Sequence, residues 1–570
     1  MLHIFSFTYQ FRNKLLVALF LLLGSLSGQA QAPAWQTAIE LGQTRGGNPN
    51  PVYNGNSIEV RTTAADASGN IFIAGMLTGT VSFGPTTLTS AGESDIFVAK
   101  WSTTRNAFVW AQQAGGSLTD GATELVVEGS NIYMTGDVTG TANFGTLTMT
   151  DPAVTNMQLG YLVKLTDAGS TASFTWLQPI GNPGGGYVSG LAVKGPAVYL
   201  TGAFRNTISF GNTTLTSAGS TDIHVVKMLD GGPSASFVWA QRMGGTGIDY
   251  GGKLAVTAAG LYLTGDFAGV ADFGPSSLTS TSNYNVFVAK LTEVAGAPNF
   301  AWVRQMGGSE YSSFSAPLAV SGTNVYVGGS FVGTARFGST TITSLDNRKD
   351  GFITRLTDNG NSADFAWVQR AGGSGDTYVT RFLVQGSDMY VGGGFTLAAS
   401  FGSTTLTNTR SYNFDVFVAK LTDTGNAGYF QWAQSATGSG SVQLAGLVKQ
   451  GTNLYTSGKF NYSATFGTLS VSSPSIYASY LATLPISLAT AVRPTATQLP
   501  LDFYPNPAHT TVQVPLATPV TLLTLIDQLG RTVRMQAGST LPLHNVTPGL
   551  YLLQAATPGQ PLRAARVVVE

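Results

Sequence analysis

Side chains that could carry out catalysis are scarce in this chain of 570 residues. Cysteine is absent, and histidine occurs only at His3, His224, His509 and His544. The chain therefore has no disulfide, no thiolate nucleophile and no Cys-ligated metal. A Ser-His-Asp arrangement would have to use His224, which stands where other repeats carry Phe, Val or Leu-like residues. We expect His224 to be a packed or edge histidine, and we predict no catalytic residue and no cofactor.

Aspartates recur at two loop positions of the repeats described below. One set precedes an apolar strand and the other follows a Gly-Gly pair. Oxygen ligands in Gly-rich turns suit calcium, so a calcium site is conceivable. Each loop brings a single carboxylate, however, which a turn-forming role explains more simply. We also find no acidic pair placed for acid–base catalysis. The sets are Asp95, Asp222, Asp350 and Asp415, with Asn285 in the fourth repeat, and Asp120, Asp249 and Asp376.

Tryptophans form a second recurring set, which could in principle stack on carbohydrate. They lie mid-strand and in phase with the repeat, and burial of a Trp side chain contributes on the order of 4–6 kcal/mol. We therefore predict that they are core residues of the repeats. They are Trp35, Trp110, Trp176, Trp239, Trp302, Trp367 and Trp432.

A basic residue also recurs, once per repeat in six of the repeats. Such residues could form a cationic ring that binds anionic glycans or lipopolysaccharide. Alternatively, they cap the ends of strands in solvent and guard sheet edges, which is the reading we prefer. They are Lys100, Lys164, Lys227, Lys290, Arg355 and Lys420.

These residues belong to an internal repeat of about 64 residues. The phrase around the Trp, as in FVWAQQAGG, recurs at intervals of 66, 63, 63, 65 and 65 residues. An apolar strand ending in Gly, a Phe-Gly pair before a Thr/Ser run, and an IFVAK-like strand recur in step with it. Each repeat thus holds four short strand candidates, apolar on both faces as expected for sheets covered by neighbours. The segment after the Phe-Gly pair predicts an inserted hairpin between the second and third strands.

Counting the repeats predicts the architecture. Three of the phrases occur seven times, whereas the Trp strand is missing after ASYLATLP and reappears near the N-terminus as AWQTAIELG. An N-terminal strand that completes the last sheet would close a ring and leave few sheet edges. We therefore predict an all-β fold, a seven-bladed β-propeller of four-stranded blades. The repeat, with GNIFIAG at residues 69–75, resembles the SBBP repeats of secreted bacterial proteins; this resemblance covers about residues 33–485 and implies fold and export.

The N-terminus predicts export. Arg12 and Lys14 precede the apolar run LLVALFLLL, and small residues follow up to Ala32. This order is typical of a signal peptide, with cleavage expected after Ala30. Charged residues make up only 10% of the chain and the net charge is zero, so nucleic acid is not an expected partner.

The C-terminus predicts a second module, a small Ig-like β-sandwich. Its motifs resemble the C-terminal sorting domain of the type IX (Por) secretion system of Bacteroidetes, which implies export through that machinery. The residues that carry the resemblance are Tyr504, Pro505, Asn506 and Pro507, then Asp527 to Gly530, and Gly549 with Tyr551. An ordinary accessory module is the alternative.

The predicted domains are a signal peptide (1–30), a propeller (31–485), a linker (486–500) and a sorting domain (501–570). We expect a monomeric, non-catalytic scaffold or binding protein that is secreted or at the outer-membrane surface. Its ligands would be surface glycan, lipopolysaccharide or protein. The alternative is a polysaccharide hydrolase or lyase whose site is built from propeller loops.

Overall fold

The computed structural model divides the chain into two compact units, Met1–Ile486 and Ser487–Glu570. It describes residues 32–44, 56–152, 158–182, 185–308, 311–312, 316–408, 410–473, 477–486, 499–515, 522–527, 532–557 and 563–570. The predicted signal peptide (1–30) and nearly all of the predicted linker lie outside these residues. All described elements are strands, and no described helix is long and apolar enough to cross a membrane.

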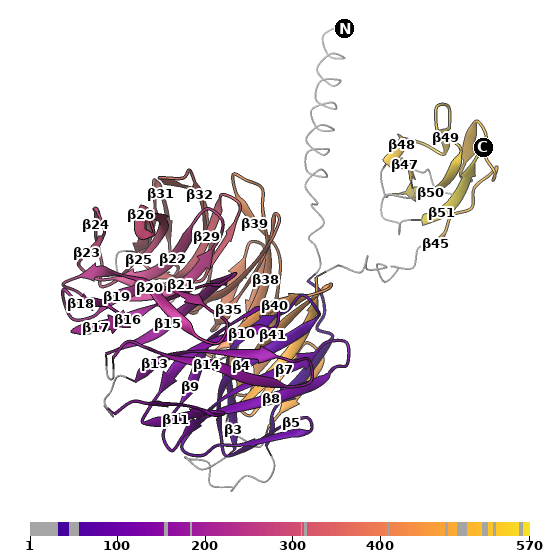
Figure 1. Cartoon of the computed structure of the whole chain (residues 1–570). Helices are drawn as coiled ribbons and strands as arrows, with labels where there is room; N and C mark the ends of the chain where they lie inside the picture. The colour runs from indigo at the N-terminus through magenta and orange to yellow at the C-terminus, as the bar shows by residue number, and fades with distance from the viewer. Residues whose placement is uncertain are drawn as a thin grey trace. The chain divides into compact units, whose positions relative to one another are not determined.

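The first unit is a propeller-like array of four-stranded antiparallel sheets (Figure 1). The third repeat runs through β15 (Gly186–Lys194), β16 (Ala197–Phe204), β19 (Asp222–Asp230) and β20 (Ala235–Gly245), each paired with the next. Every residue of β16 after Ala197 is buried. Both faces of this strand are thus covered, as expected for a sheet packed between two neighbours.

The other repeats follow the same order, from the strand we call inner to the strand we call outer. The first two are β3 (Ser57–Ala65), β4 (Asn70–Thr78), β7 (Asp95–Ser102), β8 (Ala107–Gly116), and β9 (Gly121–Glu128), β10 (Asn131–Val138), β13 (Leu159–Asp167), β14 (Ala172–Ile180). The fourth and fifth are β21 (Tyr250–Val256), β22 (Leu261–Phe267), β25 (Asn285–Val294), β26 (Ala297–Gly308), and β28 (Leu318–Ser321), β29 (Asn324–Val332), β32 (Asp350–Asp358), β33 (Ala363–Ala371). The last two are β34 (Thr377–Gln385), β35 (Asp388–Phe395), β38 (Asp415–Asp423), β39 (Gly428–Gly438), and β40 (Val442–Gln450), β41 (Asn453–Phe460), β44 (Ala478–Pro485), β1 (Thr37–Leu41).

A hairpin is inserted between the second and third strands of each repeat, where the Phe-Gly phrase predicts one. In the second repeat it consists of β11 (Thr141–Phe144) and β12 (Leu147–Thr150), and Phe144 is fully buried. This hairpin pairs with β8, the outer strand of the preceding repeat. This hairpin therefore joins two neighbouring sheets, a role that the sequence pattern alone does not indicate.

The first and last repeats lie side by side. The N-terminal strand β1 pairs with β44, with Glu40 opposite Tyr480. The next residues, β2 (Gln43–Thr44), pair with β5 (Thr80–Phe83), the hairpin of the first repeat, just as β8 pairs with β11. In Figure 1, the orange strands β40 and β41 lie beside indigo and purple strands of the first repeats, and β40 contacts β3.

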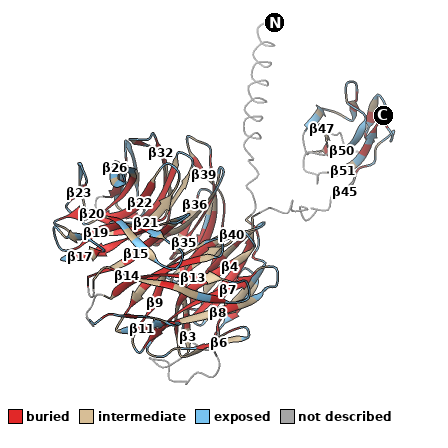
Figure 2. Ribbon diagram, in the orientation of Figure 1, coloured by how far each residue is buried: buried red, intermediate tan, exposed pale blue. Residues whose placement is uncertain are grey.

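The core is divided among the repeats. Apolar clusters form where the sheet of one repeat faces the next, so that most strands of the first unit are buried over most of their length (Figure 2). One such cluster combines Ile58 and Val60 of the first repeat with Leu41 and Leu481 of the last. Packing in the absence of disulfides therefore holds the repeats together.

The second unit contains two small sheets. One joins β45 (Leu499–Pro500), β51 (Arg563–Val569), β50 (Gly549–Ala556), β47 (Leu522–Ile526) and β48 (Thr532–Gln536). The other pairs β46 (Thr511–Gln513) with β49 (Thr540–Pro542). Its own apolar cluster, which includes Leu523, Leu553 and Val567, shows that this unit has a separate core.

Candidate functional site

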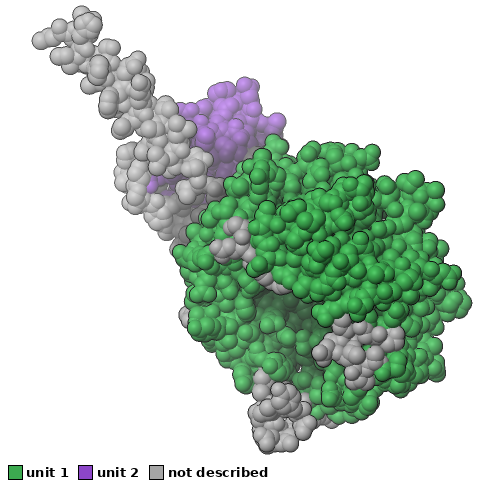
Figure 3. Space-filling model, turned by 90° about the vertical axis from the view of Figure 1, so that its left-hand side faces the viewer, with its two compact units in different colours: residues 1–486 green, residues 487–570 purple. Residues whose placement is uncertain are grey.

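A cavity of about 210 Å³ lies among the inner strands of the first unit. Its lining residues come from β3, β9, β15, β21, β28, β34 and β40, so every inner strand contributes. These strands contact one another in series, and β40 contacts β3. We call this space the central cavity. Figure 3 shows a hollow on the face of this unit that is turned toward the viewer.

A glycine on the second strand of the repeat explains how side chains are aimed at the central cavity. A Cβ on Gly202 would lie 1.8 Å from the carbonyl oxygen of Tyr187 on the inner strand, so only glycine fits there. Just beyond this close approach the pairing register shifts, between Val188 and Gly190. Such a β-bulge changes the direction of the next side chains. The lining residues of the inner strands follow these bulges.

The same arrangement recurs in five of the other repeats. A Cβ on Gly75, Gly136, Gly265, Gly393 or Gly458 would lie 1.9, 2.0, 2.4, 1.8 or 1.9 Å from an inner-strand carbonyl oxygen. Register shifts follow at the corresponding places in β3, β9, β21, β34 and β40. The repeating Gly of the sequence thus has a steric cause, and it fixes the geometry of the cavity wall.

Three charged residues line the central cavity. Lys253 of β21 forms an ion pair with Glu124 of β9. Arg381 of β34 donates through Nε to the carbonyl oxygen of Ala445, at 2.6 Å, and through Nη1 to that of Thr380, at 2.9 Å. Burial lowers the pKa of Arg381, and the nearby Glu124 opposes this effect. Since Glu124 is the one carboxylate among the described lining residues, the wall carries a net positive charge.

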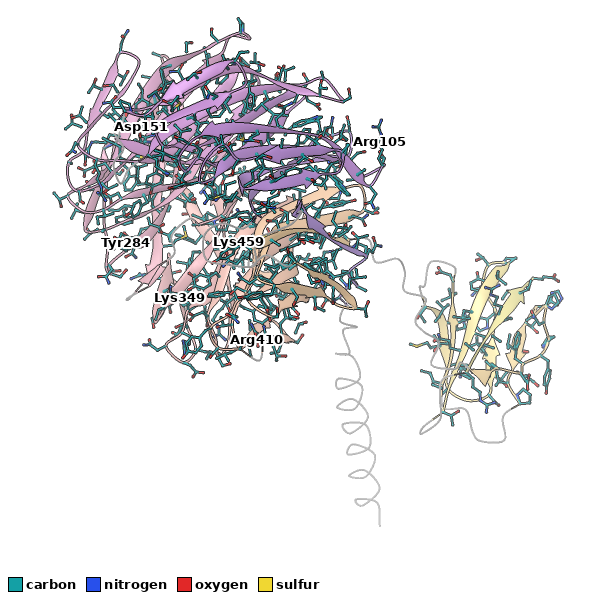
Figure 4. All side chains as sticks on the ribbon, turned by 90° about the horizontal axis from the view of Figure 1, so that it is seen from below. Arg105, Asp151, Tyr284, Lys349, Arg410 and Lys459 are labelled. Atoms are coloured by element: carbon teal, nitrogen blue, oxygen red, sulfur yellow. The ribbon has the colours of Figure 1, made fainter. Side chains whose placement is uncertain are left out.

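Further polar groups lie before and at the bulge of the inner strand β3, and on the second strands β41 and β10. Glu59 lies between Arg61, at 3.4 Å, and Lys459, at 3.0 Å. In the view of Figure 4, Lys459 lies near the middle of the first unit and Arg105 near its edge. Burial raises the pKa of Asp137 to about 7, and Arg61 opposes the shift.

A row of half-buried tyrosines adjoins these groups. The ring centroids of Tyr187 and Tyr250 are 6.5 Å apart, and those of Tyr250 and Tyr284 are 6.4 Å apart. Tyr187 and Tyr250 are the residues whose carbonyl oxygens approach the glycines of the second strands. The same bulges that shape the central cavity therefore also place these aromatic rings.

The seven repeating tryptophans are buried, with 3–7% of their surface exposed. They do not form a carbohydrate-stacking surface. Instead, the indole of one repeat donates to a carboxylate at the end of the third strand of the next. Trp302 Nε1, for example, lies 2.9 Å from Asp358 Oδ1. The series continues with Trp110 to Asp167, Trp176 to Asp230, Trp239 to Glu293 and Trp367 to Asp423.

The expectation that the repeating basic residues cap strands in solvent is wrong, and they form no cationic ring either. Lys290 is 4% exposed, and its Nζ lies 2.7 Å from Asp358 Oδ2. Tyr262 Oη donates to the same oxygen at 2.6 Å. We call each carboxylate that collects these donors a clamp acid. The equivalent ion pairs are Lys100 with Asp167, Lys164 with Asp230, Lys227 with Glu293 and Arg355 with Asp423.

Lys420 departs from this pattern. The last repeat, ending in ASYLATLP, has no acid at the equivalent position. Lys420 therefore pairs with Asp388 within its own repeat, at 2.7 Å, where the two side chains are 22% and 35% exposed. At the junction of the last and first repeats, Gln450 Nε2 instead donates to the carbonyl oxygen of Asp66 at 2.5 Å.

The loop aspartates support turns. Asp120 accepts backbone N–H groups of Gly116 and Thr139, at 2.7 and 2.9 Å. Asp95 accepts the N–H of Ala91 at 3.1 Å and the Gln113 amide at 2.6 Å. Burial raises the pKa of Asp120, Asp249 and Asp415 to about 6. The remaining members Asp222, Asn285, Asp350 and Asp376 likewise accept backbone N–H groups of nearby loops.

The described histidines do not assemble a catalytic or metal site. His224 is fully buried, its Nε2 lies 3.2 Å from the carbonyl oxygen of Tyr187, and burial lowers its pKa to about 4. Within the described part of the chain, no three His, Asp or Glu side chains are grouped to hold a metal ion. His509 is exposed and lies 3.7 Å from Glu570.

The sequence reasoning missed both the clamp acids and the central cavity. The clamp acids have a periodic signal, because Asp167, Asp230, Glu293, Asp358 and Asp423 each follow the basic residue of their repeat by three positions. The residues that line the central cavity have no such periodic signal. The residue after the bulge is Thr62, Glu124, Gly190, Arg381 and Gly446 in five of the repeats.

Residues proposed as sorting motifs lie on the strands and loops of the second unit. The Tyr504 backbone exchanges two hydrogen bonds with Gln513, Pro505 and Pro507 follow cis peptide bonds, and Asn506 Oδ1 accepts the N–H of Val568 at 2.9 Å. Tyr551 Oη donates to the carbonyl oxygen of Thr547 at 2.7 Å, and Gly549 begins β50. Asp527 follows β47, whereas Gly530 lies outside the described residues.

Residues 502–570 match the family model of the secretion system C-terminal sorting domain. The C-terminal unit is a sorting domain. A type IX sorting tail implies interaction with the type IX secretion machinery and export to the cell surface or extracellular space. The match is confined to this tail, and no curated protein matches the chain.

Three solved structures resemble the chain in shape. A protein from Lactobacillus plantarum aligns with a TM-score of 0.36 and 12% identity, over 69% of this chain and 90% of its own. Drosophila Semaphorin 2a aligns with a TM-score of 0.37 and 7% identity, over 93% and 99%. Drosophila Semaphorin 1b, extracellular domains 1-2, aligns with a TM-score of 0.35 and 6% identity, over 80% and 88%. All three TM-scores are below 0.5, so the function must be argued from the chain's own residues.

Proposed function

We propose that this protein is an exported seven-bladed β-propeller that binds a ligand in its central cavity without turning it over. Its repeats would be of the SBBP type, with β1 closing the last blade, and its tail an Ig-like sandwich. Pairing of β1 with β44 and of β2 with β5 supports closure. So do the bonds of Ser479 Oγ with Val60 N, at 3.0 Å, and with Ile58 O, at 2.9 Å, which cross the same junction.

The observation that carries a binding role is the composition of the central cavity. Hydrolysis of a glycosidic bond commonly uses two carboxyl groups about 5–9.5 Å apart. The described wall contains Glu124 alone, and that carboxylate is paired with Lys253. The wall thus offers hydrogen-bonding and charged groups for recognition, with no second carboxyl group to share acid–base work.

A glycan array followed by a turnover assay tests this proposal. The exported protein should retain a subset of glycans, and incubation with the retained glycans should release no new reducing ends and no unsaturated products. A catalytically competent polysaccharide lyase or hydrolase assayed in parallel validates the detection. Turnover of any retained glycan would overturn the non-catalytic role and favour the hydrolase or lyase, whereas retention of no glycan would remove glycans as the ligand class.

A further inference from the structure

Arg381 is held as a fixed cation at the wall of the central cavity. Its three hydrogen bonds go to carbonyl oxygens of Ala445 and Thr380, and of Arg61 at a longer 3.5 Å. These acceptors belong to β40, β34 and β3, so the guanidinium spans three successive repeats. A side chain anchored from three strands loses little further freedom when a ligand binds.

The guanidinium keeps binding capacity after these contacts. A guanidinium has five N–H donors, and the bonds to carbonyl oxygens use one on Nε, one on Nη1 and one on Nη2. One N–H therefore remains on each terminal nitrogen. Each of these N–H groups can donate a charge-assisted hydrogen bond to a carboxylate oxygen, which is stronger than a hydrogen bond between neutral groups.

The charge around Arg381 also favours an anion. Glu124 is already occupied by Lys253, and no described carboxylate forms an ion pair with Arg381. Glu124, Lys253 and Arg381 together leave one net positive charge at the central cavity, where solvent screening is weak. A partly buried cation of this kind gains stability when an anion neutralises it.

The size of the central cavity limits the ligand. At about 210 Å³ it is smaller than the roughly 300–1,000 Å³ of sites for drug-sized molecules. It can therefore take one small group, such as a single sugar ring or its acidic substituent.

We infer that the central cavity recognises a carboxylate-bearing ligand, with an acidic sugar as the chemical class, and that Arg381 binds the carboxylate. This inference rests on the proposed binding function and names its ligand class. Lys253 and Glu124 form a neutral pair beside the bound group.

Isothermal titration of D-glucuronate, D-glucose and inorganic phosphate against the purified protein at low ionic strength tests the inference. Glucuronate should bind at least about tenfold more tightly than glucose or phosphate, because only it offers a planar carboxylate to the guanidinium. R381Q should reduce glucuronate affinity about tenfold or more. R381K should bind glucuronate more tightly than R381Q but less tightly than the unaltered protein, because an ammonium lacks the planar set of donors of a guanidinium. The control R105Q, at the exposed edge of the unit, should change nothing.

A second variant keeps the test decisive if R381Q fails to fold. E124Q removes a negative charge from the wall and should increase glucuronate affinity several-fold. Equal binding of glucuronate and glucose, equal binding of phosphate, or no response of glucuronate affinity to E124Q would each overturn the inference. Binding of neutral glycans without a preference for glucuronate would overturn this inference but leave the proposed binding function intact. Turnover of a bound glycan would overturn the proposed non-catalytic function but not the role of Arg381.

Discussion

Each clamp acid gathers donors from the repeat that precedes it. Asp358 accepts Lys290, Tyr262 and Trp302 from the fourth repeat, and also the N–H of Gly360 in its own turn at 3.0 Å. Burial alone would raise its pKa, but these hydrogen bonds hold the pKa below its usual value. The buried lysine is thus neutralised and every carboxylate oxygen is satisfied, which is the condition for a buried ion pair to be tolerated.

Removing the charge of Asp358 should be costly. D358N leaves the Lys290 ammonium buried without a counterion, and we expect a loss of about 3–5 kcal/mol. D388N breaks the Lys420 pair, whose side chains are 22% and 35% exposed, and should cost about 0–1 kcal/mol. Urea unfolding followed by tryptophan fluorescence measures both. Equal losses in the two variants would show that the clamp acids are ordinary surface ion pairs.

Asp137 predicts a pH dependence of stability. Burial raises its pKa to about 7 in the folded protein, and its Oδ1 has no hydrogen-bond partner among the described residues. In the unfolded chain an aspartate ionises near pH 3.9. Between these values the folded state binds more protons, so stability is highest at the acidic end and falls as pH rises toward 7.

Replacement by asparagine should remove this dependence, since the amide is neutral at every pH. D137N should raise the urea midpoint at pH 8 and change it little at pH 4.5. Residual pH dependence from Asp120, Asp249 and Asp415, whose pKa values are raised to about 6, should persist in both proteins. An unchanged difference between pH 4.5 and pH 8 in D137N would contradict this assignment.

The role of an individual residue could be predicted from the sequence only where its contacts follow from its place within a single repeat. Burial of the tryptophans follows from their place mid-strand. The partner of Lys100 is Asp167, 67 positions away in the next repeat, so local sequence gives no sign of the ion pair. Arg381 lies on an inner strand like its counterparts, and only the packing of these strands turns that position into a cavity wall.

At the scale of elements, hydrophobic patterning predicts the strands and the inserted hairpin well. It does not predict that β11 pairs with β8 of the preceding repeat, because the partner of a short hairpin depends on how the sheets pack. The hydrophobic pattern also does not predict the β-bulges of the inner strands. The repeating glycines mark them, but the cause is a carbonyl oxygen on a neighbouring strand.

The strand β1 should stabilise the last repeat. Trp35, just before it, packs edge-to-face on Phe466 at 5.1 Å, and its Nε1 donates to the carbonyl oxygen of Ser435 at 3.0 Å. W35A should therefore cost about 3–5 kcal/mol locally and speed amide hydrogen exchange in β44. The exposed aromatic Tyr412 provides the control Y412A, which should leave exchange in β44 unchanged. Equal protection of β44 in W35A and the unaltered protein would contradict this role for β1.

At the scale of the whole molecule, the chain consists of two units, and the second has its own apolar core. The tail was identifiable from its sequence motifs, and residues 502–570 match the family model of the sorting domain. The closed ring stays a prediction from counting repeats, because a missing outer strand at one end of the array matches an extra strand at the other. The central cavity could not be expected, since its side chains differ from repeat to repeat and carry no period.

Ring closure can be tested covalently because the chain contains no cysteine. The hydroxyl oxygens of Thr37 and Thr483 lie 2.7 Å apart across the β1–β44 pairing, although 446 positions separate them in sequence. In the purified, folded protein, T37C/T483C should form an intramolecular disulfide nearly completely and resist unfolding by on the order of 5 kcal/mol more than its reduced form. The single-cysteine variant T37C should form no intramolecular disulfide. Failure of T37C/T483C to cross-link within one folded chain, or cross-links only between chains, would contradict a closed ring.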